Sequence, residues 1–284
     1  MKIGIVADST AYFRPEDKIK YNIETVPVNV LFEGKVYRDG IDLTASQAYQ
    51  FLEKNPDDWA TSAPAVGEFL VAFKKLAAQG AESIICLTLA QSISATWNNA
   101  RNAKIAAEKE MPGVKIEVVD SGTAVIGETL LVLAIGRAAA EGRNLEELIE
   151  LLEKLKKKIR VFILLETIRY VYRSGRVPQI ASKIGSILPL KPILSVHGGR
   201  LHFGGATISK EKSREKILRI LKEETDPNYP EVGLAYINTS EEAEKLKKEI
   251  LSLMPSAKIF ISEFSPIVGY ATGLGTIGIS FFVK

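Results

Sequence analysis

The 284-residue chain has a single cysteine, Cys86, and only two histidines, His197 and His202. One cysteine excludes an intrachain disulfide framework. Because Cys86 lies inside the apolar run 84–89, we expect a small core residue and not a nucleophile. The two histidines flank a Gly-Gly turn without carboxylates beside them, which indicates surface polarity and no metal site. So few bases also make a hydrolase triad a poor expectation.

Long apolar runs and an excess of one charge are absent as well. No segment approaches the roughly 18 uninterrupted apolar residues of a membrane span, and the N-terminal MKIGIVADST reads as a short strand with no signal-peptide core. The net charge is +3, and the basic cluster 154–160 is interrupted by Leu155 and Ile159, which predicts a solvated helix face. We therefore expect a cytoplasmic protein with no nucleic-acid partner and no stable membrane insertion.

Strands and helices alternate over the first half of the chain. The expected strands are 2–7, 25–32, 83–89 and 114–119; the expected helices are 65–79, 94–110 and 128–140, followed by one with a capping box from Asn144 to Glu147. Such alternation predicts a parallel sheet sandwiched by helices.

Hairpins appear after about residue 160. Segments 192–196 and 200–203 flank a turn, and strands are also expected at 161–165, 232–237, 258–262 and 277–283. Helices are expected at 167–173 and 209–224 and after a second capping box, Thr239 to Glu242. The predicted fold class is α/β with two domains: residues 1–158 with a parallel sheet, and residues 159–284 with a mixed, partly antiparallel sheet.

Hydroxyl side chains lie at four places where we expect strands to end, at 8–10, 61–62, 92–96 and 120–121. Each group alone is typical of an N-cap or a turn. Ligands of parallel sheets bind beyond the carboxyl ends of the strands, so together the groups favour one binding edge. Hydroxyls and helix N-termini without lysine, arginine or a glycine-rich turn suit a small anion of modest charge, such as a carboxylate.

Two further motifs need a separate interpretation. GLGTIG at 273–278 has the spacing of a dinucleotide fingerprint, but only six residues follow it, so we interpret it as a tight loop whose backbone approaches a ligand or another segment. Gly175 is a plausible left-handed helix cap. Arg176 then either bonds the last carbonyls of that helix or provides a cation near a ligand head group or a partner's phosphate.

The sequence resembles the DegV family, the fatty-acid-binding proteins of the EDD fold, over essentially its whole length. The motifs that carry the resemblance occur in the family's order: IVADST (5–10), VPVNVLFEGKVYRDGIDLT (26–44), ATSAP (60–64), SISATWNNA (92–100), VVDS (118–121), SGRV (174–177), LPLKPIL (188–194) and GYATGLGTIG (269–278).

The resemblance implies a lipid-binding protein without turnover of its own that buries a long-chain fatty acid, such as palmitate, between its domains. By resemblance Thr61 and Ser94 hold the carboxylate, and a partner fatty acid kinase phosphorylates the bound fatty acid to an acyl-phosphate. Possible contacts to the head group or the partner are Ser62, Thr96, Arg176, Tyr270, Thr272 and Gly273. No metal and no cofactor other than the lipid is implied.

The chain departs from the family pattern at three positions. Ala271 replaces the histidine of the C-terminal loop, Ala95 replaces a glycine of the LSGTY-like motif, and Ser174 replaces the first glycine of the GGR-like motif. These changes affect competence with a kinase more than lipid binding. Tyr270 or Thr272 could supply the missing polar group.

A fatty-acid tunnel would be lined by ordinary core residues, so composition does not reveal it. Candidates for the lining are Phe69, Phe73, Ile93, Leu188, Phe264 and Ile267. The alternative function is an enzyme acting on a small carboxylate or phosphate at the strand ends, and the scarcity of general bases disfavours it.

Overall fold

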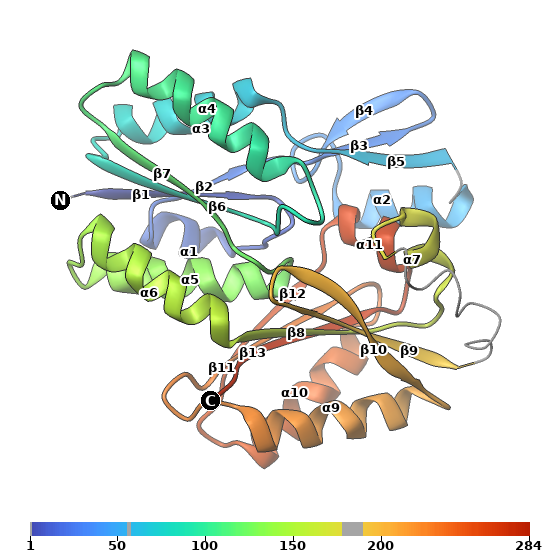
Figure 1. Cartoon of the computed structure of the whole chain (residues 1–284). Helices are drawn as coiled ribbons and strands as arrows, with labels where there is room; N and C mark the ends of the chain where they lie inside the picture. The colour runs from blue at the N-terminus through green and yellow to red at the C-terminus, as the bar shows by residue number, and fades with distance from the viewer. Residues whose placement is uncertain (1, 56–57, 178–189) are drawn as a thin grey trace.

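The computed structural model of the chain describes residues 2–55, 58–177 and 190–284. Three sheets and the helices between them make up the fold (Figure 1). The first sheet is parallel, with strand order β2-β1-β6-β7. Its strands are β1 (Ile3–Asp8), β2 (Ile23–Val26), β6 (Ser83–Thr88) and β7 (Lys115–Asp120).

Helices cover both faces of the parallel sheet. Alternation along the strands sends Val6, Ile84 and Cys86 to one face, where α3 (Val66–Ala78) and α4 (Thr96–Glu110) pack on them. Ile5 and Leu87 face the other way, onto α5 (Ile126–Ala140). Cys86 is fully buried in this packing, as predicted.

The second sheet is mixed, with strand order β10-β9-β8-β13-β11-β12. Its strands are β8 (Ile159–Leu164), β9 (Lys191–His197), β10 (Arg200–Thr207), β11 (Glu231–Tyr236), β12 (Lys258–Glu263) and β13 (Ile277–Phe282). Only β11 and β12 pair in parallel. The predicted fold class, a parallel sheet followed by a partly antiparallel one, is confirmed.

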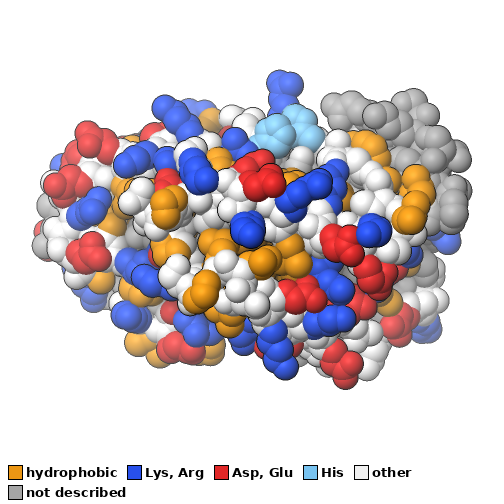
Figure 2. Space-filling view, turned by 90° about the horizontal axis from the view of Figure 1, so that it is seen from below, with side chains coloured by type: hydrophobic (Ala, Val, Ile, Leu, Met, Phe, Trp, Pro, Cys, Tyr) orange, Lys and Arg blue, Asp and Glu red, His pale blue; other side chains and the backbone are white. Residues whose placement is uncertain are grey.

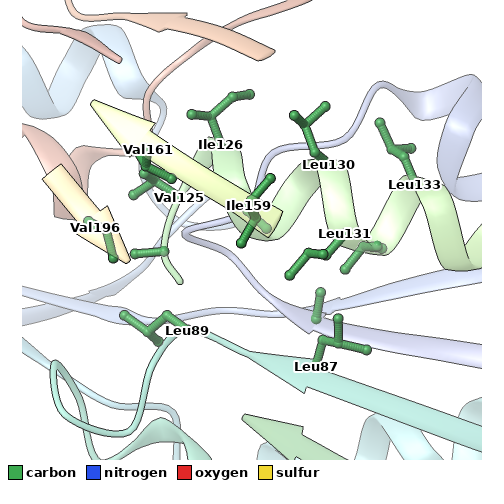
Figure 3. Close-up of a cluster of buried hydrophobic side chains, with 14 of the residues drawn as sticks. Leu87, Leu89, Val125, Ile126, Leu130, Leu131, Leu133, Ile159, Val161 and Val196 are labelled. Carbon is green, nitrogen blue, oxygen red and sulfur yellow. The ribbon is translucent and has the colours of Figure 1, made fainter. Parts of the chain in front are cut away.

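Helix α5 lies between the two sheets. Figure 3 shows Leu131 of α5 pointing toward Leu87 of β6, Ile126 and Leu130 pointing away from it, and Ile159 of β8 beside the helix. Gly233 of β11 packs so closely that a Cβ there would lie 2.5 Å from Ile126 Cγ1. The neighbouring α6 (Leu145–Lys158) begins with the predicted capping box between Asn144 and Glu147. One continuous core therefore joins both halves of the chain.

The outer face of the mixed sheet is covered by α9 (Lys210–Glu224) and α10 (Ser240–Leu253). Figure 2 shows acidic and basic side chains interspersed on this face, and ion pairs such as Arg214–Glu249 and Lys210–Glu242 join the two helices. The capping box predicted at Thr239 is wrong, because its side chain makes no cap hydrogen bond.

A third, small sheet closes one end of the molecule. It has the order β4-β3-β5, with β3 (Asn29–Phe32), β4 (Lys35–Arg38) and β5 (Trp59–Ser62). The single strand expected over residues 25–32 is wrong, since the chain leaves the parallel sheet at Pro27 and enters this one.

The short helices α1 (Pro15–Lys20), α2 (Ala45–Lys54), α7 (Arg169–Ser174) and α11 (Pro266–Thr272) complete the fold. Of these, α2 and α11 pack on the small sheet. Among the described residues, no helix is long and apolar enough to cross a membrane.

Candidate functional site

A cavity lies where the carboxyl edge of the parallel sheet meets the mixed sheet and the small sheet. It contains about 880 Å³ of space not filled by atoms, its opening included. Most of its lining is apolar and comes from both sides of residue 158. The apolar lining residues are Val28, Ala63, Leu89, Ile93, Ala124, Val125, Ile163, Val171, Val196, Leu201, Ile267, Val268 and Ala271.

Polar side chains occupy a smaller share of the lining. They are Thr10, Thr61, Ser62, Ser94, Ser174, Arg176, Tyr270 and Thr272. An adjoining, more open hollow is lined by Ser94, Ser174 and Arg176 as well, and adds Ser92 and Gly175. The two also share Ala63 and Ile93. Because this hollow is the more open of the two and shares five lining residues with the cavity, it is the mouth of the cavity, and most of the apolar lining lies behind it.

Thr61 reaches the cavity from the antiparallel small sheet, where it lies opposite Val30. The expectation that its strand belongs to the parallel sheet is wrong. Its hydroxyl is half-buried and makes no hydrogen bond within the described residues, so it is free to donate to a ligand. Asn99 Nδ2 of α4 donates to Pro64 O at 2.8 Å and fixes the segment after Thr61 against that helix.

Ser94 lies in the turn that precedes α4. Its Oγ is 2.8 Å from Thr96 Oγ1 and accepts a hydrogen bond from the Thr96 backbone N–H at 3.3 Å. Thr96 is fully buried and does not line the cavity. When Thr96 donates its hydroxyl proton to Ser94, the Ser94 proton is available to an acceptor in the cavity. Thr96 thus acts on the site through Ser94.

The other predicted contacts are placed as follows. Ser62 and Arg176 are exposed at the cavity, and the Arg176 guanidinium donates to Ser174 O at 2.5 Å, beside the left-handed cap Gly175. This is the helix-end bond, one of the two alternatives for Arg176. The ring of Tyr270 lies under the Arg173 guanidinium, 5.1 Å from ring centre to Cζ.

Thr272 lines the cavity, but its hydroxyl donates to Val268 O at 2.8 Å, so it can only accept from a ligand. Gly273 does not line the cavity. A Cβ on Gly273 would lie 2.4 Å from the Tyr170 ring, and one on Gly278 would lie 2.3 Å from the Phe264 ring. The first four residues of GLGTIG therefore form a loop in close contact with neighbouring side chains, as predicted, and the last two begin β13.

Ile93 and Ile267 line the cavity, as expected for a tunnel. Phe69 and Phe73 do not: α3 buries both against the opposite face of the parallel sheet, because that face also needs an apolar cover. Phe264 packs in the main core and against Gly278 instead. Leu188 lies outside the described residues.

Four segments with hydroxyl side chains were expected at one edge of the sheet, and three of them, 8–10, 61–62 and 92–96, contribute residues to the cavity lining. The fourth, at residues 120–121, forms a turn: Asp120 Oδ1 accepts from the Gly122 N–H at 2.9 Å, and Ser121 Oγ donates to Thr123 O at 3.2 Å.

Sequence reasoning missed the buried carboxyl groups behind the cavity. Asp8 and Glu128 are both 0% exposed, and both approach the Thr10 hydroxyl. Burial raises the pKa of Asp8, against hydrogen bonds from Thr10 and Leu89. Burial and then the charge of Asp8 raise the pKa of Glu128 well above its ordinary value. A lone glutamate in the apolar segment IGETLLVLAIG was the available signal.

Asp39 is a third buried carboxyl group, at the junction of the sheets. Its Oδ2 accepts from the Ser9 hydroxyl at 2.6 Å, and Ser9 Oγ accepts from the Val28 N–H at 3.0 Å. Burial raises the pKa of Asp39 to about 6, although hydrogen bonds from Ser9 and Ser265 oppose the rise. Ser265 caps α11, so Asp39 connects the first strand, the small sheet and a C-terminal helix.

These features define an α/β protein with a largely apolar cavity between its sheets and hydroxyl groups near the cavity mouth. The family model described as uncharacterised proteins of the DegV family matches residues 2–284, and the chain belongs to that family.

Relatives in sequence and in structure span the same length. A DegV domain-containing protein of Halalkalibacterium halodurans is 28% identical over 100% of this chain and 99% of its own. The stearic-acid-binding protein of Eubacterium ventriosum is 26% identical, with a TM-score of 0.89 over 100% of this chain and 99% of its own. DegV of Bacillus subtilis, a fatty acid binding protein, is also 26% identical, with a TM-score of 0.88 over the whole of both chains.

Proposed function

We propose that this protein binds one long-chain fatty acid in the cavity, with the carboxylate at Thr61 and Ser94 near the mouth and the tail among the apolar residues behind them. The observation that carries the proposal is that two hydroxyls, Thr61 from the small sheet and Ser94 from the turn between β6 and α4, reach one mostly apolar cavity. Two solved relatives above 25% identity, described as binding stearic acid and fatty acid, support it.

The energetics favour such a ligand. Burial of a methylene contributes about 0.8 kcal/mol, so roughly 14 methylenes contribute on the order of 11 kcal/mol before association costs. A carboxylate leaving water needs hydrogen bonds in return. The Thr61 and Ser94 hydroxyls supply them, and Tyr270 takes the polar role near Ala271, since its side chain also lines the cavity.

The protein has no turnover of its own in this proposal. Asp8 and Glu128 are fully buried behind Thr10, so neither reaches a ligand as a general base. The carboxylate lies near the mouth, where a partner fatty acid kinase can reach it, with Ser62 and the exposed Arg176 beside it. Residues 1–158 and 159–284 form the two lobes that enclose the tail.

The test is the double variant Thr61→Ala with Ser94→Ala. Loss of two hydrogen bonds to a carboxylate, each worth about 1–3 kcal/mol, weakens palmitate binding more than tenfold. Isothermal titration of delipidated protein measures the affinity, and Ser252→Ala, an exposed hydroxyl of α10, serves as the matched control. An unchanged affinity in the double variant would refute the head-group assignment. Absence of palmitate binding by the unaltered protein would refute the proposed function.

A further inference from the structure

Thr10 is a polar residue of the cavity lining, and its hydroxyl contacts two buried carboxyl groups, Asp8 and Glu128. Its Oγ1 lies 2.6 Å from Asp8 Oδ1 and 3.4 Å from Glu128 Oε2. A threonine hydroxyl has one proton and can donate one hydrogen bond. The shorter contact takes that proton, so the contact with Glu128 needs a proton from Glu128 itself.

Asp8 has the surroundings of an ionised carboxylate. Its Oδ1 accepts from the Thr10 hydroxyl and from the Thr10 backbone N–H at 3.1 Å, and its Oδ2 accepts from the Leu89 N–H at 2.8 Å. Three donors compensate the charge of one buried carboxylate. Asp8 is therefore the charged partner.

Glu128 has the opposite surroundings. Its Oε1 has no hydrogen-bond partner among the described residues. The charged groups that raise its pKa are Asp8 on β1 and Asp120 on β7, both acidic, and the buried Cys86 thiol of β6 is also close enough to be affected by it. The hydrogen bonds that Glu128 makes with the Thr10 hydroxyl and the Asp8 N–H lower its pKa, but burial has the largest effect and raises it.

The Leu89 N–H that Asp8 holds is at the start of the segment leading to Ser94. Leu89 itself lines the cavity, and Figure 3 shows it at the end of β6, across from Val125 and the start of α5. Ala90 continues the segment: its carbonyl accepts from the Ser94 N–H at 3.3 Å. A displaced Asp8 would therefore loosen the turn that presents Ser94.

We propose that Glu128 carries a proton at neutral pH, donates it to Thr10 Oγ1, and through Thr10 and Asp8 acts as a positioning residue for the turn from Leu89 to Ser94. Ionisation of Glu128 places two adjacent buried carboxylates in repulsion and releases this turn. For ligand affinity the inference rests on the proposed function; for the order of the turn it does not.

The test compares Glu128→Gln, which mimics the protonated acid, with Glu128→Ala, which removes it. Glu141→Gln, an exposed glutamate just after the same helix, is the matched control. Hydrogen exchange of the Leu89 amide without ligand is the first measurement. At neutral pH we expect the alanine variant to exchange at least tenfold faster at Leu89, relative to the Ile85 amide in mid-strand, and the glutamine variant to match the unaltered protein.

The pH profile is the second measurement. As the pH rises above 4.5, the ordinary pKa of a glutamate, the unaltered protein should lose thermal stability relative to Glu128→Gln until Glu128 ionises in the folded state, while Glu141→Gln follows the unaltered protein. Equally fast exchange at Leu89 in Glu128→Gln and Glu128→Ala, or parallel pH profiles for Glu128→Gln and the unaltered protein, would overturn the proposal.

Palmitate titration of the same variants gives the third measurement: affinity should fall at least tenfold in Glu128→Ala and be restored in Glu128→Gln. If neither the unaltered protein nor any variant binds palmitate, but the Leu89 amide exchanges as expected, the proposed function is refuted and the positioning role of Glu128 is not.

Discussion

At the scale of single residues, the chemistry of this protein depends on a few polar groups placed against apolar surroundings. Thr61 has a hydroxyl without a hydrogen-bond partner in the part of the chain that the structure describes, and Ser94 has one whose partner, Thr96, can donate to it. Sequence reasoning finds these two positions because the motifs are distinctive. It does not find Glu128, because the sequence does not show that Asp8 and Thr10, more than 110 positions earlier, meet it in the core.

Asp39 gives a prediction at the same scale. A carboxyl group whose pKa rises from 3.8 to about 6 on folding contributes stability that is fully present below pH 3.8 and is lost as the pH rises through 6. At about 1.4 kcal/mol per tenfold change, the loss is about 3 kcal/mol. We expect Asp39→Asn, which still accepts from Ser9, to remove this loss. Urea denaturation at pH 4 and pH 8 measures it; the same pH dependence in Asp39→Asn would contradict the expectation.

At the scale of elements, the sequence pattern of a capping box predicted the N-terminal cap of α6 correctly but not that of α10. Asn144 and Glu147 cap α6 reciprocally, at 2.8 and 3.0 Å, whereas the similar pattern at Thr239 gives no cap hydrogen bond. We expect Asn144→Ala to cost about 1 kcal/mol and Thr239→Ala to cost clearly less. Chemical denaturation of the pair checks this difference, and equal losses would show that the observed caps do not govern helix stability.

The small sheet was missed although its local signal is present. Glu33 and Gly34 both have positive φ, 47° and 73°, and they join two four-residue strands, which is the geometry of a tight hairpin turn. A non-glycine residue at the first of these positions weakens the pattern in the sequence. The break between β2 and β3 does have a local mark, because Pro27 cannot donate to a strand ladder. Entry of the chain into a different sheet depends on the tertiary packing of α2 and α11 and has no local mark.

Helix α3 gives a second prediction at this scale. The sequence pattern of Phe69 and Phe73 does not distinguish residues that line a tunnel from residues that pack in a core. The structure places Phe73 in the core. We expect Phe73→Ala to lower the free energy of unfolding by about 3–5 kcal/mol and to leave palmitate affinity within about twofold. Calorimetry and titration on the same preparation separate the two effects. A large loss of affinity with little loss of stability would place Phe73 in the binding site after all.

At the scale of the whole molecule, α5 prevents the two halves from being independent. Its residues pack on β1 and β6 on one side and on β8 and β11 on the other, with Ile126 against Gly233. The division at residue 158, which we propose as the boundary between two lobes, cuts through this shared core. Alternating strands and helices predicted the layers; they did not predict that one helix would serve both sheets, because an apolar helix has the same sequence pattern in either case.

Cooperative unfolding follows from that shared core. We expect one thermal transition for the chain, with the same midpoint by far-ultraviolet circular dichroism and by tryptophan fluorescence. Trp59 and Trp97 both report on the first half of the chain, and the far-ultraviolet signal reports on both halves.

A fragment of residues 1–158 leaves the second face of α5 uncovered and should not fold to a native-like monomer. If palmitate binds in the cavity as proposed, palmitate at 100 times its dissociation constant should raise the stability of the intact chain by about 2.7 kcal/mol. A single transition should remain, because the cavity lining comes from both sides of residue 158. Two separate transitions, with only one shifted by palmitate, would show instead that each lobe folds alone and that the ligand belongs to one of them.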